Sequence, residues 1–190
     1  DMERLREISR EVGPIQIVFA GKAHPNDLQG RELIRTVFEA REVLGEDLQV
    51  AYLSNYGLSL GKLMTSGVDI WLNTPQPPLE ASGTSGMKSA LNGVPSLSIA
   101  DGWWIEGCIE GVTGWSIDDS ADDAMAVRDM RLAAESLYKK LEDTVLPTFY
   151  GNHALWVDMM KHAIAMNGSF FQTHRIMAEY MLKAYFPVES

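Results

Sequence analysis

Residues 68–100, VDIWLNTPQPPLEASGTSGMKSALNGVPSLSIA, contain the pattern that decides the fold. The segments 68–72 and 95–100 are short apolar runs, which are typical of buried strands. Between them, a loop dense in Pro, Gly and Ser (73–86) leads into a short helical segment that Asn92 and Gly93 end. A strand, a helix and another strand in this order predict two parallel strands joined by a crossover.

The same alternation extends to both sides of this segment. Asn26 or Asp27 is placed to cap a helix that Gly45 ends. Further strands are predicted at 15–21 and 48–53, and further helices at 57–67, 124–141, 155–166 and 173–185. The sequence therefore predicts an α/β fold with a parallel sheet and flanking helices.

The composition is that of an ordinary globular protein, with 46% hydrophobic and 22% charged residues. The formal net charge of −10 would repel a nucleic-acid backbone or an anionic membrane surface, so neither is an expected partner. No apolar run approaches the roughly 20 residues that cross a bilayer. A single cysteine, Cys108, fits a reducing compartment, and we expect the cytoplasm. His153, His162 and His174 lack a metal-ligand spacing with Cys108, so no metal site is expected.

The loop that precedes Lys88 has the composition of an anion-binding site. In a parallel sheet, ligands bind outside the carboxyl ends of the strands, where this loop is placed. The small residues ASGTSG (81–86) allow close approach of the backbone to a ligand, and the helix that follows directs free N–H groups toward an anion. By composition alone, a flexible turn with a solvated Glu80 and Lys88 is the better explanation of these residues.

Lys88 favours the binding site over the solvated turn. Its neighbours Met87, Ser89, Ala90 and Leu91 indicate a packed helix and not a free surface. A lysine amine near a helix N-terminus can act as a nucleophile toward an aldehyde, which is the requirement for a Schiff base.

Three segments resemble those of the α-1,4-glucan phosphorylases. EASGTSGMK (80–88) resembles the pyridoxal-phosphate signature, SNYGLSL (54–60) is similar to a second family segment, and DGWWIEG (101–107) resembles the shorter bacterial and archaeal type. The resemblance extends from Ile15 to THRIMAEY (173–180). It implies a Rossmann-like parallel sheet with flanking helices, the C-terminal domain of a GT-B glycosyltransferase fold. The implied activity is phosphorolysis of α-1,4-glucans by inorganic phosphate, which releases glucose-1-phosphate.

The resemblance also implies roles for individual residues. Lys88 would carry pyridoxal 5′-phosphate, and the backbone N–H groups of Thr84 and Ser85 would hold its phosphate. The other implied cofactor-binding residues are Tyr56, Gly57 and Leu58. In this family the cofactor phosphate exchanges a proton with inorganic phosphate while the glycosidic bond breaks with retention.

The implied substrate-binding residues face the glucosyl unit. Glu80, which with Lys88 would be catalytic, would accept a hydrogen bond from a sugar hydroxyl. Ser82 and Gly83 would also contact the sugar.

One part of the family pattern has no match in the chain. Phosphorylases bring an Arg and Lys pair to the substrate phosphate from a segment before the strand at 15–21, and residues 1–14 do not match it. We therefore expect residues 1–165 to form the cofactor-binding domain without its first strand and helix. Residues 166–190 would form a C-terminal helix that packs toward an absent N-terminal domain. We expect the chain alone to be inactive. The sequence leaves open whether the protein forms a homo-oligomer.

Two other functions stay open. A nucleotide-sugar-dependent glycosyltransferase of the same architecture, such as a glycogen or starch synthase, usually carries a second acidic residue eight positions after the first, to bind ribose. Lys88 stands at that position, and an amine suits an aldehyde better than ribose hydroxyls. A non-catalytic carbohydrate-binding domain would require residues 80–88 to be vestigial, and nothing in them looks degraded.

Several aromatic and basic residues have less specific interpretations. Lys22 and His24 follow the strand at 15–21 and would face the ligand crevice, although such loop ends are often structural. We expect Trp103 and Trp104 to point to opposite sides of an extended segment, one into the core and one toward the cleft. A helical stripe predicts core or interdomain packing and consists of Met177, Tyr180, Met181 and Tyr185.

Overall fold

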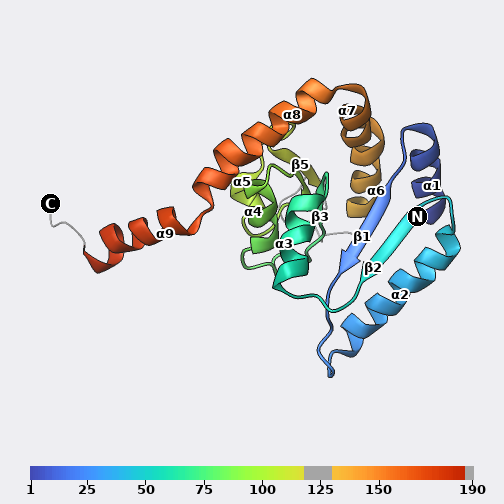
Figure 1. Cartoon of the computed structure of the whole chain (residues 1–190), viewed down its shortest axis with the longest axis horizontal. Helices are drawn as coiled ribbons and strands as arrows, with labels where there is room; N and C mark the ends of the chain where they lie inside the picture. The colour runs from blue at the N-terminus through green and yellow to red at the C-terminus, as the bar shows by residue number, and fades with distance from the viewer. Residues whose placement is uncertain (118–129, 187–190) are drawn as a thin grey trace. The chain divides into compact units, whose positions relative to one another are not determined.

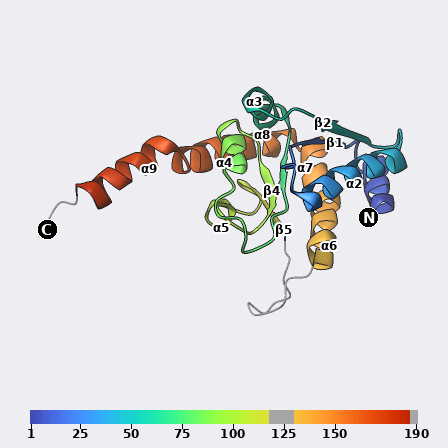
Figure 2. The same ribbon diagram turned by 90° about the horizontal axis from the view of Figure 1, so that it is seen from below.

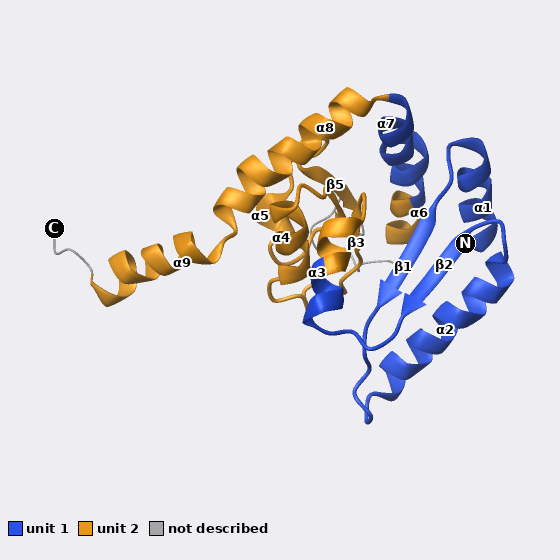
Figure 3. Ribbon diagram, viewed as in Figure 1, with its two compact units in different colours: residues 1–62, 138–151 blue, residues 63–137, 152–190 orange. Residues whose placement is uncertain are grey.

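The computed structural model describes residues 1–117 and 130–186, and the chain divides into two compact units (Figure 3). Unit 1 comprises Asp1–Lys62 and Tyr138–Gly151, and unit 2 comprises Leu63–Leu137 and Asn152–Ser190. Each unit contains a small parallel sheet with helices beside it. The predicted α/β class with parallel strands is therefore confirmed, with the strands in two sheets.

Unit 1 is built on two strands and the helices around them. Its elements are α1 (Met2–Glu11), β1 (Gln16–Ala20), α2 (Leu28–Leu44), β2 (Gln49–Leu53), the start of α3 (Leu58–Gly67), the end of α6 (Met130–Lys140), the π-helical turn η1 (Leu141–Val145) and α7 (Leu146–Gly151). Asp27 caps α2, because its side chain accepts a hydrogen bond from the N–H of Gly30 at 2.8 Å. The helix ends at Gly45, whose φ of 59° suits glycine.

The core of unit 1 is formed by its sheet, by α2 and by Leu5 of α1. Strands β1 and β2 run parallel, with Ile17 opposite Val50, and α2 runs beside β2 (Figure 1). Leu44 at the end of α2 is buried with Leu48 and Val50, and Val37 packs against them. The apolar face of α2 therefore packs against the apolar face of the sheet, and this contact holds the helix that connects β1 to β2 in place.

Unit 2 contains the three-stranded sheet. Its elements are the end of α3, β3 (Trp71–Asn73), α4 (Thr84–Leu91), β4 (Ser96–Ile99), α5 (Trp104–Gly107), β5 (Gly114–Ile117), most of α6, α8 (His153–His162), the π-helical turn η2 (Ala163–Gly168), α9 (Thr173–Tyr180) and the π-helical turn η3 (Met181–Tyr185). Strand β4 is central, parallel to β3 and β5, and all four of its residues are buried. Figure 2 labels β4 and β5 side by side. The ring of Trp115 on β5 packs at 5.9 Å from that of Trp156, so α8 covers part of this sheet.

Strand β5 is the main difference from the sequence prediction, which places no strand after residues 95–100. The strand is four residues long and follows Gly111 and Thr113, so its local sequence resembles a turn. Pairing with β4 and the burial of Trp115 and Ile117 produce it. The strand predicted at 68–72 begins farther along the chain, as β3 (Trp71–Asn73). Part of the predicted helix at 124–141 lies outside the described residues.

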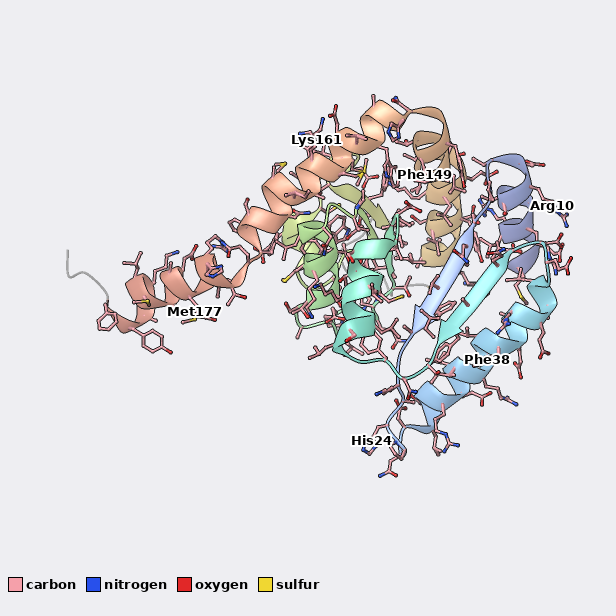
Figure 4. All side chains as sticks on the ribbon, in the orientation of Figure 1. Arg10, His24, Phe38, Phe149, Lys161 and Met177 are labelled. Atoms are coloured by element: carbon pink, nitrogen blue, oxygen red, sulfur yellow. The ribbon has the colours of Figure 1, made fainter. Side chains whose placement is uncertain are left out.

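Helix α9 and the turn η3 expose a series of apolar side chains. Met177, labelled in Figure 4, is 52% exposed, and Tyr180 and Tyr185 are more exposed still. Within residues 1–117 and 130–186, none of the helices has the length and apolar character needed to cross a membrane.

Candidate functional site

The loop between β3 and α4 forms the centre of the candidate site. Strand β3 ends at Asn73, and the loop reaches α4 through Gly83, the N-cap residue. Gly83 has a φ of 80°, which places it in the left-handed region. Any side chain here would be strained, and its Cβ would lie 3.2 Å from the ring of Trp103. Glycine at this position therefore shapes the entry into α4.

The first turn of α4 presents N–H groups that the helix cannot satisfy. The first N–H groups of a helix have no acceptor within it, and Gly83 supplies no side-chain cap. The N–H of Gly86 turns back to the carbonyl of Gly83 at 3.2 Å. Within residues 1–117 and 130–186, the N–H groups of Thr84 and Ser85 have no acceptor, so they can bind an anion at the positive end of the helix dipole.

The turn that follows β4 is hydrogen-bonded to this loop. One carboxylate oxygen of Asp101 accepts a hydrogen bond from the N–H of Glu80 at 3.0 Å, and the other accepts from the N–H of Gly102 at 3.0 Å. The N–H of Trp103 donates to the carbonyl of Ser82 at 2.8 Å. A Cβ at Gly102 would lie 2.7 Å from the same carbonyl oxygen, so glycine permits the close approach of the two segments.

Trp103 and Trp104 are both buried, and the expectation that one of them lines the cleft is wrong. Their segment is helical and not extended, because Trp103 is the N-cap of α5 with φ −62°. The two rings lie 5.1 Å apart, and Phe171 packs edge-on to Trp103 at 5.1 Å. This aromatic cluster packs against the loop, because the Trp103 ring lies next to Gly83 and Gly86.

The two residues predicted to be catalytic differ in exposure. Glu80 is half-buried, whereas Lys88 is exposed on α4. The packed surroundings expected for Lys88 are not found within the described residues, because α4 buries Gly86, Ser89 and Ala90. At 100° per residue, those three share one side of the helix and Lys88 points to the other. Its amine is therefore accessible to a ligand.

The remaining residues predicted to bind the cofactor belong to unit 1. Tyr56, Gly57 and Leu58 lie where the chain enters α3, and Leu58 is 96% exposed. The hydroxyl of Tyr56 lies 2.8 Å from where a Cβ of Gly61 would be, so the ring rests on the first turn of α3. Glu80, Ser82, Gly83, Thr84, Ser85 and Lys88 belong to unit 2.

Lys22 and His24 lie in the exposed connection after β1 (Figure 4 labels His24). The imidazole of His24 accepts a hydrogen bond from the N–H of Asn26 at 3.2 Å. The backbone carbonyl of His24 accepts a hydrogen bond from the N–H of Asp27 at 2.8 Å. These contacts give His24 a structural role in its own turn. Within the part of the chain that is described, no three His, Cys, Asp or Glu side chains are grouped to hold a metal ion.

Comparison with known proteins identifies the family. The model of the carbohydrate phosphorylases matches residues 2–114, which include the loop, α4 and the turn after β4. The chain belongs to the carbohydrate phosphorylase family. It is 45% identical over 186 residues to a maltodextrin phosphorylase of Thermococcus litoralis, an alignment that covers 97% of this chain and 22% of that enzyme.

Two glycogen phosphorylases are similar to the same degree. That of Aquifex aeolicus is 42% identical over 191 residues, with 97% of this chain and 27% of the relative covered. That of Mycobacterium tuberculosis is 40% identical over 193 residues, with 98% and 22% covered. The chain thus spans about a quarter of the length of the phosphorylases that it matches.

Reasoning from the sequence missed Asp101 as part of the site of this phosphorylase chain. Asp101 lies in DGWWIEG, a segment used to recognise the family, but no role was expected for its carboxylate. The side chain is buried, and both of its oxygens accept backbone hydrogen bonds. The available signal was its position, directly after the central strand of the sheet.

Gly86→Ala is expected to disturb the phosphorylase loop. The new Cβ would lie 2.8 Å from the indole nitrogen of Trp103, and that ring is buried between Trp104 and Phe171, so it cannot move aside. We expect a loss of about 1–3 kcal/mol in stability, measured by thermal unfolding. Gly67→Ala, whose Cβ meets nothing within 4 Å, is the matched control. An unchanged melting temperature for Gly86→Ala would contradict this packing.

Proposed function

We propose that the protein to which this chain belongs cleaves α-1,4-glucans with inorganic phosphate and releases glucose-1-phosphate with retention of configuration, using pyridoxal 5′-phosphate. The observation that supports this most directly is Lys88, exposed on the helix whose N-terminal N–H groups are uncapped. An amine that can reach an aldehyde and an anion-binding helix N-terminus are the two features that this cofactor requires.

The residues at the site fit the cofactor by their chemistry. The amine of Lys88 would attach it, and the N–H groups of Thr84 and Ser85 would bind its phosphate. The family resemblance adds Tyr56, Gly57 and Leu58, at the start of α3, to the proposed cofactor-binding residues. When bound, the cofactor supplies a phosphate group for proton exchange with inorganic phosphate.

The sugar-facing side of the site would be formed by the start of the loop. Glu80 is half-buried, and its backbone N–H donates a hydrogen bond to Asp101. This bond fixes the backbone from which the Glu80 carboxylate extends. An ionised carboxylate accepts a hydrogen bond from a sugar hydroxyl more strongly than a neutral acceptor does. Ser82 and Gly83 would lie against the same sugar. Lys88 argues against a nucleotide-sugar donor, because a carboxylate would be needed there to bind ribose.

We also propose the domain organisation expected from the sequence. Residues 1–165 would be most of the cofactor-binding domain, Rossmann-like and of GT-B type, and 166–190 a helix that packs toward an N-terminal domain. The exposed apolar side chains of α9 and η3, among them Met177, Tyr180 and Met181, support this arrangement. A second domain over these side chains would remove their apolar surface from water.

The proposed function is tested by incubating the full-length enzyme with maltodextrin, inorganic phosphate and pyridoxal phosphate. We expect glucose-1-phosphate to be released, with the α configuration. A protein that makes glucan only from a nucleotide sugar, or that binds glucan without turnover, would contradict the proposal.

Glu80→Gln is expected to lower kcat/KM for maltodextrin about 30-fold, while cofactor content stays unchanged. The substitution keeps the size of the side chain but replaces a charged acceptor, a change worth about 2 kcal/mol. The measurement is steady-state kinetics on the full-length enzyme beside the absorption spectrum of the bound cofactor. Equal loss of cofactor and of activity would show that Glu80 serves the cofactor instead of the sugar.

A further inference from the structure

We propose that Asp101 is a positioning residue for Glu80, and that it acts through the backbone of the loop on the sugar-facing side of the site. The inference rests on the proposed function and names a residue on which the geometry of that site depends. Asp101 makes its contact across 21 positions of sequence, from the end of the central strand to the start of the loop.

The backbone that carries the Asp101 side chain is fixed by burial and by two hydrogen bonds. Asp101 is 7% exposed and follows β4, in which every residue is buried. Its own N–H donates to the carbonyl of Ile99 at 2.9 Å, and its carbonyl accepts from the N–H of Trp104 at 3.3 Å. A side chain on such a rigid support can fix a flexible segment that it contacts.

Both oxygens of the carboxylate are used. One accepts from the N–H of Glu80 and the other from the N–H of Gly102, each at 3.0 Å. Hydrogen bonds to an ionised acceptor are roughly twice as strong as neutral ones. Removal of the carboxylate would leave two N–H groups without their partner, and asparagine would satisfy only one of them.

Two contacts from the turn after β4 fix the loop on either side of Ala81. Asp101 holds the N–H of Glu80, and the N–H of Trp103 holds the carbonyl of Ser82. Together they set the backbone from which the side chain of Glu80 extends. Lys88 lies farther along, on a helix that packs through Ser89 and Ala90. Loss of the Asp101 contact should therefore affect the sugar side of the site more than cofactor attachment.

The first test is a double-mutant cycle in the full-length holoenzyme. We expect Asp101→Ala to lower kcat/KM for maltodextrin about tenfold and Asp101→Asn to have a smaller effect. In the Glu80→Gln background, Asp101→Ala should cost less than about twofold, because the carboxylate that it positions is already gone. Asp69→Asn, an exposed aspartate of the same unit, is the control and should match the wild type.

The second test does not depend on activity. Hydrogen–deuterium exchange of the full-length enzyme should be faster in peptides that cover residues 79–86 in Asp101→Ala, and unchanged in Asp69→Asn. Cofactor content should equal that of the wild type in both. If Asp101→Ala does not fold, Asp101→Asn provides the same comparisons with smaller effects.

The results separate this proposal from the proposed function. Losses that multiply in the double mutant, unchanged exchange at 79–86, or cofactor loss in step with activity would each overturn the role of Asp101. A wild-type holoenzyme without phosphorolysis would overturn the proposed function, and with it the sugar-facing role. The exchange measurement would still decide whether Asp101 holds the loop.

Discussion

Lys88→Ala in the full-length enzyme is expected to abolish covalent attachment of pyridoxal phosphate and, with it, phosphorolysis. Alanine offers no amine to the aldehyde, and no other residue of α4 carries one. The uncapped N–H groups of Thr84 and Ser85 would still attract the phosphate, so we expect weak, reversible binding of the cofactor. The measurements are the absorption spectrum after dialysis and the rate of glucose-1-phosphate release.

The site of attachment can be located directly. Borohydride reduction of the wild-type holoenzyme, followed by peptide mapping, should place the pyridoxyl label on Lys88. Lys161→Ala provides a matched control, since Lys161, labelled in Figure 4, is an exposed helical lysine of the same unit. Its ion pair with Asp158 lies at the surface. A label on Lys22 or Lys62 would contradict the assignment.

The 190-residue chain by itself is expected to release no glucose-1-phosphate from maltodextrin and phosphate. A substrate phosphate beside the cofactor phosphate needs cationic groups in place before the reaction. Residues 1–14 carry arginines, but they already have acidic partners in unit 1. Arg4 pairs with Glu142, and Arg6 and Arg10 both pair with Asp47.

The assay compares the chain with the full-length enzyme at the same excess of cofactor. Turnover by the chain above background would show that it contains the phosphate-binding cations, and Lys22 and the three arginines would then be the first to substitute. Weak cofactor retention by the chain is expected as well, because a site open to water weakens each electrostatic contact.

Much of the fold was predictable because its signals are local. The apolar runs that become β1, β2 and β4 are bounded by glycine, proline or charged residues, and Asp27 and Gly45 mark the ends of α2. Strand β5 carries no such signal, since four residues beside Gly111 and Thr113 resemble a turn until β4 pairs with them. The burial of both Trp103 and Trp104 also escaped prediction, because an extended segment was assumed where α5 begins.

The sequence by itself determined the family and the residues that the family signature names. Lys88, Thr84 and Glu80 stand at fixed spacing in one continuous segment, and such spacing can be read without a structure. Which side of α4 is buried, and therefore that Lys88 is exposed, depended on where the helix meets its neighbours. The contact between Asp101 and Glu80 depended on the fold in the same way. A hydrogen bond needs two groups within about 3 Å, and only the packing of β3 beside β4 brings these two segments, distant in sequence, to the same edge of the sheet.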